Sequence, residues 1–209
     1  MIYDITRPLS PHTVVFPGDP PVTVTPVLQI RHGDPCNVSS IAMSVHAGTH
    51  VDAPRHYADG APGVDALDVE TLTGVARVVT FGRGGPILPD DVQAMNLRGA
   101  RRLIIHTPAS QSPPGVFDPS FAWFTPEAAD WLGAAGVRLI GTDAPSVDEA
   151  SSLDLPAHHV FLKHGTLIVE NLDLRGVPDG EYFLVALPLK IVDGDAAPAR
   201  VILFDRAPA

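Results

Sequence analysis

Short runs of hydrophobic residues, each bounded by turn-forming residues, predict β-strands along most of the chain. Val, Ile, Leu and aromatic side chains dominate these runs, and such side chains fit the pleated surface of a sheet. The predicted strands are residues 22–30, 39–45, 75–81, 102–107, 137–142, 166–170, 182–187 and 200–204. The pattern therefore predicts a β-rich chain.

Three other segments predict short helices, namely residues 67–72, 89–95 and 126–132. The second begins with Asp90 and Asp91, whose charge suits the first turn of a helix. The third has the strongest end signals, because Thr125 can cap it, Pro126 fits its first position and Gly133 or Gly136 can end it. Strands and helices together predict a mixed α/β fold with a β-rich core and few short helices.

Length and composition favour one folded domain over residues 1–209. The 22 prolines and 18 glycines are spread through the chain, which predicts many short elements joined by tight turns and no long linker. A hydrophobic content of 45% argues against disorder. No apolar run approaches the roughly 18 residues that a membrane-spanning helix needs.

The charge balance indicates which partners the chain can take. Fourteen Lys and Arg against 24 Asp and Glu give a formal net charge of −10, which disfavours nucleic acids and anionic membranes and favours a small-molecule substrate. The first residues show no secretory signal, so we expect a cytoplasmic protein. Cys36 is the single cysteine, which excludes an internal disulfide and leaves imidazole and carboxylate as metal ligands.

Residues 46–56 form the densest group of possible metal ligands. The stretch H-A-G-T-H-V-D-A-P-R-H places His46, His50, Asp52 and His56 within eleven residues. Imidazole and carboxylate groups are ligands that Zn²⁺ and similar ions accept. A single histidine is more often packed or solvated, but three of them with an aspartate at even offsets favour a metal site.

Geometry restricts how this stretch could bind an ion. In an extended chain, alternate residues share one face, but His46 and Asp52 would then lie roughly 20 Å apart at about 3.3 Å per residue. The ligands of one ion all lie about 2 Å from it. The segment must therefore bend, and Gly48 supplies the backbone freedom, while Pro54 argues against a continuous helix.

A second group of possible ligands lies far along the chain. His158 and His159 are adjacent, and Glu170 follows a Leu-Ile-Val run where an unpaired carboxylate would carry a large desolvation cost. A bound cation would remove that cost. Alternatively, Glu170 marks the end of the strand and meets water, and the residues themselves leave both interpretations open.

Several motifs together carry a resemblance to a known family. They are H-x-G-T-H-x-D-x-P-x-H at residues 46–56, F-P-G-D at 16–19, G-T-D-A-P-S at 141–146, the interval from His158 to Glu170, and L-P-L-K at 187–190. With these motifs the chain resembles the cyclase family, and within it the bacterial kynurenine formamidases (arylformamidases). The likeness extends from Asp4 to Phe204.

The resemblance implies a fold, a cofactor and its ligands. The family fold is a swivelling β/β/α single domain, usually found as a homodimer, and the family site holds two Zn²⁺ ions per subunit, for which Mn²⁺ could substitute. His46 and His50 match ligands of the first ion and His158 matches a ligand of the second. Asp52 and Glu170 match the carboxylates that the two ions share.

The resemblance also implies an activity, the hydrolysis of N-formyl-L-kynurenine to L-kynurenine and formate in tryptophan catabolism. Hydroxide formed from water at the metal would attack the formyl carbon, and His56 matches the acid/base that moves the proton. By its position His56 could instead be a fifth ligand. Phe16 stands where this branch tends to carry a substrate-lining Trp, which leaves the aryl group of the substrate open.

Two hypotheses of other kinds remain. The same metals could serve a hydrolase of another cyclic amide or lactone, such as an isatin-like lactam, or a dehydratase. Alternatively, the metals could be purely structural. Structural zinc sites are normally closed by four protein ligands that commonly include cysteine, whereas Cys36 lies outside the ligand cluster.

Overall fold

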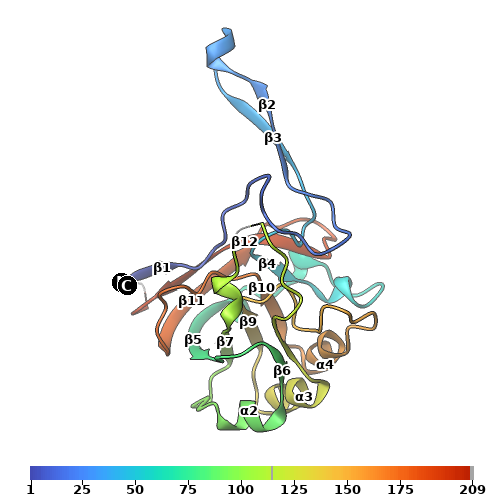
Figure 1. Ribbon diagram of the computed structural model, residues 1–209, viewed down its shortest axis with the longest axis vertical. Helices are drawn as coiled ribbons and strands as arrows, with labels where there is room; N and C mark the ends of the chain where they lie inside the picture. Colours follow the sequence, from blue (N-terminus) through green and yellow to red (C-terminus); the bar gives the residue numbers. More distant parts are fainter. Residues whose placement is uncertain (114, 208–209) are drawn as a thin grey trace.

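The computed structural model describes residues 1–113 and 115–207, and its centre is a mixed β-sheet that closes on itself (Figure 1). Its strands, in spatial order, are β1 (Ile2–Asp4), β12 (Ala196–Phe204), β11 (Gly180–Pro188), β5 (Thr73–Thr80), β7 (Arg102–His106), β9 (Leu139–Thr142), β10 (Leu167–Glu170) and β4 (His50–Asp52). Because β4 also pairs with β12, the seven strands from β12 to β4 form a barrel.

Strand direction explains where the helices lie. β5, β7, β9 and β10 run parallel to one another, and each parallel step needs a crossover connection. The crossovers contain α2 (Pro89–Ala94), α3 (Pro126–Ala134) and α4 (Pro156–His164), which gather on one side of the barrel (Figure 1). β4, β11 and β12 pair antiparallel with their neighbours and complete the barrel.

Alternation along the strands divides the core into two parts. Ile104 packs with residues on the inside of the barrel, whereas its neighbours Leu103 and Ile105 pack against the helices. In β10, Val169 points inward and Ile168 points toward the helices. These strands are buried on both faces, which is why their sequences are continuous hydrophobic runs.

The predicted mixed α/β fold with few short helices is confirmed, and α3 begins and ends close to its predicted bounds. Thr125 caps α3, since its hydroxyl accepts a hydrogen bond from the backbone N–H of Ala128 at 3.3 Å. The other two predicted helices correspond to α1 (Val69–Leu72) and α2. No helix within residues 1–113 and 115–207 has the length and apolar character needed to cross a membrane.

The sequence analysis missed α4, although both of its ends carry ordinary helix signals. Pro156 occupies the first turn, and Gly165 follows the last residue with φ 65°, a left-handed conformation that glycine adopts readily. It also missed β1, β4, β6 (Gly85–Ile87) and β8 (Ala122–Phe124). Each of these strands has three residues, too few for a hydrophobic period to appear.

The predicted strand at residues 39–45 is shorter than expected. It is β3 (Val38–Ala42), which pairs with β2 (Thr23–Leu28) to form a hairpin separate from the barrel. The chain leaves the extended conformation after Ala42 because it must turn before Gly48 to enter β4. The hairpin projects away from the barrel (Figure 1).

Phe161→Ala is expected to lower the free energy of unfolding by about 3–5 kcal/mol, since removing a large buried side chain leaves a cavity. Phe161 is fully buried in α4 and meets Phe124 edge to face, with ring centroids 5.6 Å apart. Urea denaturation measures the change. The control is Val69→Ala, an exposed position that should shift stability by less than about 0.5 kcal/mol. Equal effects of the two substitutions would contradict this packing.

Candidate metal centre

The pairing of β4 with β10 brings acidic and imidazole side chains together. His50 and Asp52 share one face of β4, while Val51 between them points into the barrel. The antiparallel register sets His50 opposite Glu170 and Asp52 opposite Ile168. Residues directly opposite each other share a face of the sheet, so all three polar side chains lie on the helix-covered side.

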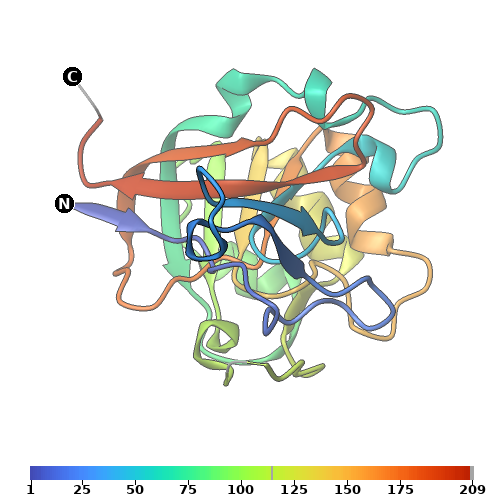
Figure 2. The same ribbon diagram turned by 90° about the horizontal axis from the view of Figure 1, so that it is seen from above.

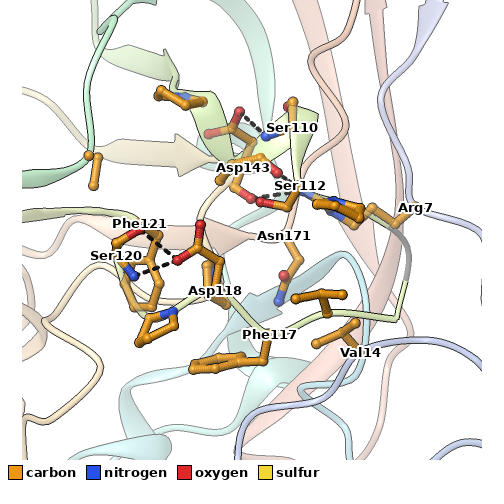
Figure 3. Close-up of a pocket in the computed structure, with 18 of the residues that line it drawn as sticks. Arg7, Val14, Ser110, Ser112, Phe117, Asp118, Ser120, Phe121, Asp143 and Asn171 are labelled. Carbon is orange, nitrogen blue, oxygen red and sulfur yellow. Dashed lines mark hydrogen bonds between the residues drawn. The ribbon is translucent and has the colours of Figure 1, made fainter.

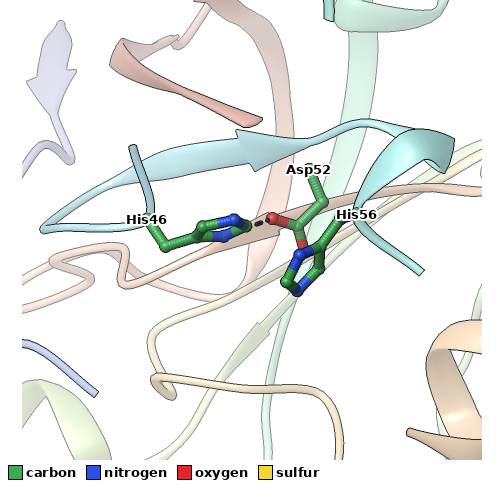
Figure 4. Close-up of side chains that lie close together, drawn as sticks. All are labelled: His46, Asp52 and His56. Carbon is green, nitrogen blue, oxygen red and sulfur yellow. Dashed lines mark ion pairs between the residues drawn. The ribbon is translucent and has the colours of Figure 1, made fainter. Parts of the chain in front are cut away.

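Two bends return the flanking histidines to the same place. Gly48 has φ 68°, so the chain turns immediately before β4, as predicted, and His46 lies in that turn. After β4, the 3₁₀ turn Pro54–His56 reverses the chain again. The rings of His46 and His56 consequently lie 4.1 Å apart between centroids, and both lie beside the Asp52 carboxylate (Figure 4).

Helix α4 supplies the remaining imidazole. Ala157 and Phe161 pack into the helix-covered core, and this packing turns His158 toward the strands. Its Nε2 lies 3.4 Å from Oδ2 of Asp52 and 3.6 Å from Oε1 of Glu170. His158 is buried, whereas the adjacent His159 is exposed.

Asp52 lies at the centre of the cluster, and each of its oxygens faces a different set of imidazoles. Oδ1 lies 3.1 Å from Nδ1 of His46 and 3.2 Å from Nε2 of His50, while Oδ2 faces His158. The two oxygens of Glu170 are arranged in the same way. Oε2 lies 3.4 Å from Nε2 of His50, and Oε1 lies near Nε2 of His158. Both carboxylates thus connect the two imidazole sets.

These atoms fit the ligands of bound metal ions. Nε2 of His50, Nε2 of His158 and both oxygens of Asp52 are buried without a hydrogen-bond partner among the residues that the structure describes. Leaving such groups unpaired is costly, and a cation between them would remove the cost. Ligands at about 2.0–2.1 Å from a tetrahedral ion lie about 3.3–3.4 Å from one another, close to the separations of 3.1–3.6 Å found here.

The histidines are also oriented for metal binding. Nδ1 of His50 lies 2.9 Å from the carbonyl oxygen of Gly48, and Nδ1 of His158 lies 2.6 Å from Oδ2 of Asp148. Each Nδ1–H can donate to that acceptor, so the lone pair of Nε2 is directed into the cluster. This arrangement, together with the burial of Glu170, favours the cation interpretation of Glu170 over the alternative of a strand end in water.

Without metal, the cluster holds its protons tightly. Burial lowers the pKa of His50 and of His158, but the carboxylates around them, Asp52 and Glu170 for both and Asp148 for His158, outweigh it and raise each pKa to about 10. Burial likewise raises the pKa of Asp52, but the surrounding imidazoles hold it well below the usual range. Metal ions must therefore displace protons from these imidazoles when they bind.

His56 differs from the other three histidines of the cluster. Like His46 it is half-buried, but it also lines an open depression of about 610 Å³ together with Tyr57, and its ring lies 5.8 Å from that of His158. Burial lowers its pKa. Three residues, His46, Asp52 and His56, each offer one ligand atom, and these atoms lie within 4.8 Å of one another. This spacing also fits the alternative in which His56 is a fifth ligand.

Sequence reasoning missed several residues that contact this cluster. Asp148 accepts hydrogen bonds from the backbone N–H groups of Ala157 and His158 as well as pairing with the His158 ring. Asp195 lies 2.9 Å from Nε2 of His46. Both acids are remote in sequence from the histidines they contact, so no local spacing indicated them. Tyr57 could have been found, because it directly follows His56.

Phe16 lies outside the cluster and packs edge to face on Phe117, with ring centroids 5.3 Å apart. Phe117 lines a cavity of about 770 Å³, which is also lined by Val14, Ser110 and Asn171 (Figure 3). Asn171 directly follows Glu170 in the chain, so adjacent residues contribute to the cavity and to the metal-ligand cluster. Phe16 thus contacts the wall of a cavity that could hold a small molecule.

Comparisons with known proteins agree on one family. The model of the cyclase family, described as "Putative cyclase", matches residues 3–149. The chain is 41% identical over 206 residues to a kynurenine formamidase of Salinibacter ruber, and this match covers 98% of this chain and 97% of that one. It is 40% identical over 203 residues to a kynurenine formamidase of Bordetella avium, and this match covers 97% of each chain. A solved structure described as a potential metal-dependent hydrolase with cyclase activity has a TM-score of 0.87 and 31% identity, covering 100% of this chain and 99% of that one.

Asp148→Asn is expected to weaken Zn²⁺ or Mn²⁺ binding about 10- to 100-fold, because the charged acceptor that orients the His158 ring is lost. Competition with a chromogenic chelator measures the affinity. Asp143→Asn is the matched control, since Asp143 is a buried carboxylate that binds Thr107 and Ser110 and not the cluster. Equal metal affinity in the Asp148 variant and the wild type would contradict the orienting role.

The metal-free protein is expected to lose stability as pH rises. The pKa of His50 and His158 is about 10 in the folded chain, against about 6.5 when unfolded. Their contribution to the free energy of unfolding is therefore complete below pH about 6.5 and disappears as pH rises through about 10. Urea denaturation of chelator-treated protein across this range tests it, with metal-saturated protein as the control. A constant stability of the metal-free protein would contradict the expectation.

Proposed function

Since the chain belongs to the cyclase family, we propose that it is a metal-dependent amide hydrolase that cleaves N-formyl-L-kynurenine to L-kynurenine and formate. Its kynurenine formamidase relatives match it over nearly their whole length. The observation that carries the proposal is the position of Asp52, whose two carboxylate oxygens face different imidazole sets. Such a carboxylate suits a pair of ions that act on one carbonyl substrate.

The proposed cofactor is a pair of Zn²⁺ ions, with Mn²⁺ as the alternative. His46 and His50 would hold one ion, His158 would hold the other, and Asp52 and Glu170 would be shared. Bound ions would polarise the substrate carbonyl and lower the pKa of water to about 7. The chain itself contributes rigidity, because the strand register and α4 fix these side chains in a buried setting.

His56 is the proposed acid/base. Burial lowers its pKa, so its imidazole is neutral near pH 7 and can accept a proton from the attacking water. The same ring then donates that proton to the departing amine, which leaves as the free aryl amine. Its place at the open depression, beside Tyr57, gives a substrate access to it.

Phe16 is the proposed substrate-binding residue. Its edge-to-face contact with Phe117 holds the ring in place, and an aromatic wall suits the aryl group of an N-formyl aromatic amide. Phenylalanine offers a smaller face than tryptophan and no N–H donor. Phe16→Leu should therefore weaken substrate binding more than it slows the chemical step.

Three further predictions of the sequence accompany this function. They are a single domain over residues 1–209, a homodimer and a cytoplasmic location.

Turnover of N-formylkynurenine, measured together with metal content, tests the proposal. His56→Ala should keep its metal and lose about 100- to 10,000-fold in kcat, because only proton transfer is removed. Glu170→Ala should lose metal and activity together. The control is His32→Ala, an exposed histidine outside both the cluster and the depression, which should behave as wild type.

Each other outcome points to a different conclusion. Metal loss in His56→Ala would make His56 a fifth ligand and not an acid/base. Turnover of isatin with no turnover of N-formylkynurenine would move the chain to the lactam-hydrolase alternative. Full activity in both the His56 and Glu170 variants would refute the proposed site.

A further inference from the structure

Arg7 lies on the wall of the cavity of about 770 Å³ that Asn171 also lines (Figure 3). The overall path of the segment after β1 that carries it can be followed in Figure 2. Nε of Arg7 donates to the carbonyl oxygen of Leu172 at 3.2 Å, and Nη2 donates to those of Ala109 and Asp143 at 3.3 and 3.1 Å. Nη1 has no hydrogen-bond partner within residues 1–113 and 115–207. Its two N–H groups are therefore left for a ligand.

The positive charge of Arg7 lacks a negative partner. In the part of the chain that the structure describes, no carboxylate forms an ion pair with it, and its three acceptors are neutral carbonyl groups. Burial lowers the pKa of Arg7, and the charges of Asp143 and Asp173 oppose this shift without cancelling it. Asp143 accepts a hydrogen bond from Thr107, and Asp173 pairs with Arg175. Because a partly buried charge is normally paired, Arg7 indicates that the ligand of this cavity carries an anionic group.

Hydrogen bonds also connect Arg7 to the metal centre. Its backbone N–H donates to the hydroxyl of Thr49 at 2.9 Å, and that hydroxyl donates to the carbonyl oxygen of Asn171 at 2.6 Å. Thr49 directly precedes His50, and Asn171 directly follows Glu170. The guanidinium group is thus fixed relative to two of the proposed metal ligands, and such preorganisation favours specific binding.

Asn171 joins Glu170 to Leu172, so in the chain it stands between a proposed metal ligand and a residue that holds Arg7. Its φ of 56° is left-handed, a conformation that asparagine adopts more readily than most residues. Its backbone N–H donates to the carbonyl oxygen of Ala144. Among the described residues its side-chain amide has no hydrogen-bond partner, although it lines the cavity. The amide therefore offers a donor and an acceptor to a ligand.

The spacing of these groups suits one kind of molecule. The Cα atoms of Glu170 and Leu172 are at most about 7 Å apart, because each residue spans at most about 3.6 Å. In N-formylkynurenine about seven bonds separate the formyl carbon from the carboxylate carbon, which is roughly 8 Å in an extended chain. The ketone oxygen of that molecule lies between the two. One molecule can therefore reach both the metal centre and Arg7.

We propose that this cavity binds the amino-acid chain of the substrate, with its carboxylate on Nη1 of Arg7 and its ketone oxygen on the side-chain amide of Asn171. Arg7 and Asn171 are then specificity-determining residues that hold the formyl group at the metal centre. The inference rests on the proposed function, since it concerns the same substrate. It adds that efficient turnover requires an anionic group at the end of the chain.

Two substrates that differ only in the carboxylate test this requirement in the wild-type enzyme. N-formylkynuramine is N-formylkynurenine without that group. The metal-loaded enzyme should show about 10- to 100-fold lower kcat/KM for N-formylkynuramine, because a hydrogen bond between a guanidinium group and a carboxylate is charge-assisted. Equal kcat/KM values for the two substrates would overturn the proposal.

Arg7→Gln should remove most of this preference, by lowering kcat/KM for N-formylkynurenine while leaving that for N-formylkynuramine unchanged. The ratio of the two values is measured within one preparation, so a fraction of unfolded protein does not affect it. Arg7→Lys is the second variant, since lysine keeps the charge but not the planar donor fork, and its preference should be intermediate. The control is Arg200→Gln, an exposed arginine outside the cavity. A wild-type preference in both Arg7 variants would contradict the assignment.

Asn171→Gly isolates the amide, because glycine adopts the left-handed conformation without strain. This variant should lower kcat/KM about fivefold or more for both substrates, since both keep the ketone and one hydrogen bond is lost from each. Its preference between them should stay that of the wild type. Unchanged kcat/KM in Asn171→Gly would remove Asn171 from the proposal.

Product binding separates this inference from the proposed reaction, because it requires no turnover. In calorimetry with metal-loaded wild type, L-kynurenine should bind about 10-fold or more tightly than kynuramine, and Arg7→Lys should reduce the difference. If L-kynurenine shows this preference but N-formylkynurenine is not hydrolysed, the proposed reaction is wrong and the carboxylate site stands. If N-formylkynurenine is hydrolysed and neither assay shows a preference, the reaction stands and the carboxylate site is refuted.

Discussion

Two carboxylates buried among three imidazoles are the constraint on which the site depends. Asp52 is fully buried and Glu170 nearly so, and the unpaired oxygens of Asp52 would be costly without positive charge beside them. Protons on the imidazoles satisfy this need in the metal-free chain, and divalent ions would satisfy it in the loaded one. The same carboxylates therefore account for the raised histidine pKa values and for the expected affinity for metal.

The barrel can carry this polar cluster because its strands separate polar from apolar side chains. Val51 and Val169 belong to the barrel interior, while Asp52 and Glu170 from the same strands face the side covered by α4. The barrel-interior contacts of these two strands thus lie on the opposite face from the metal ligands. Fixed strands and a packed helix hold the cluster more rigidly than loops could.

Residues that face a substrate lie on different elements. His56 ends the 3₁₀ turn Pro54–His56 and Tyr57 follows it, while Phe16 lies on the segment that leads into the β2–β3 hairpin. Metal binding can therefore stay constant in the family while the surrounding loops set which amide enters.

The sequence by itself determined the local parts of this protein. The even spacing of residues 46–56, the bend at Gly48 and the caps of α3 are properties of neighbouring residues, and each appears in the structure. The position of Glu170 opposite His50 depends on strand register, and the contacts of Asp148 and Asp195 join segments that are distant in the chain. Only the tertiary structure could decide these, because pairing and packing over long separations leave no local period in a sequence.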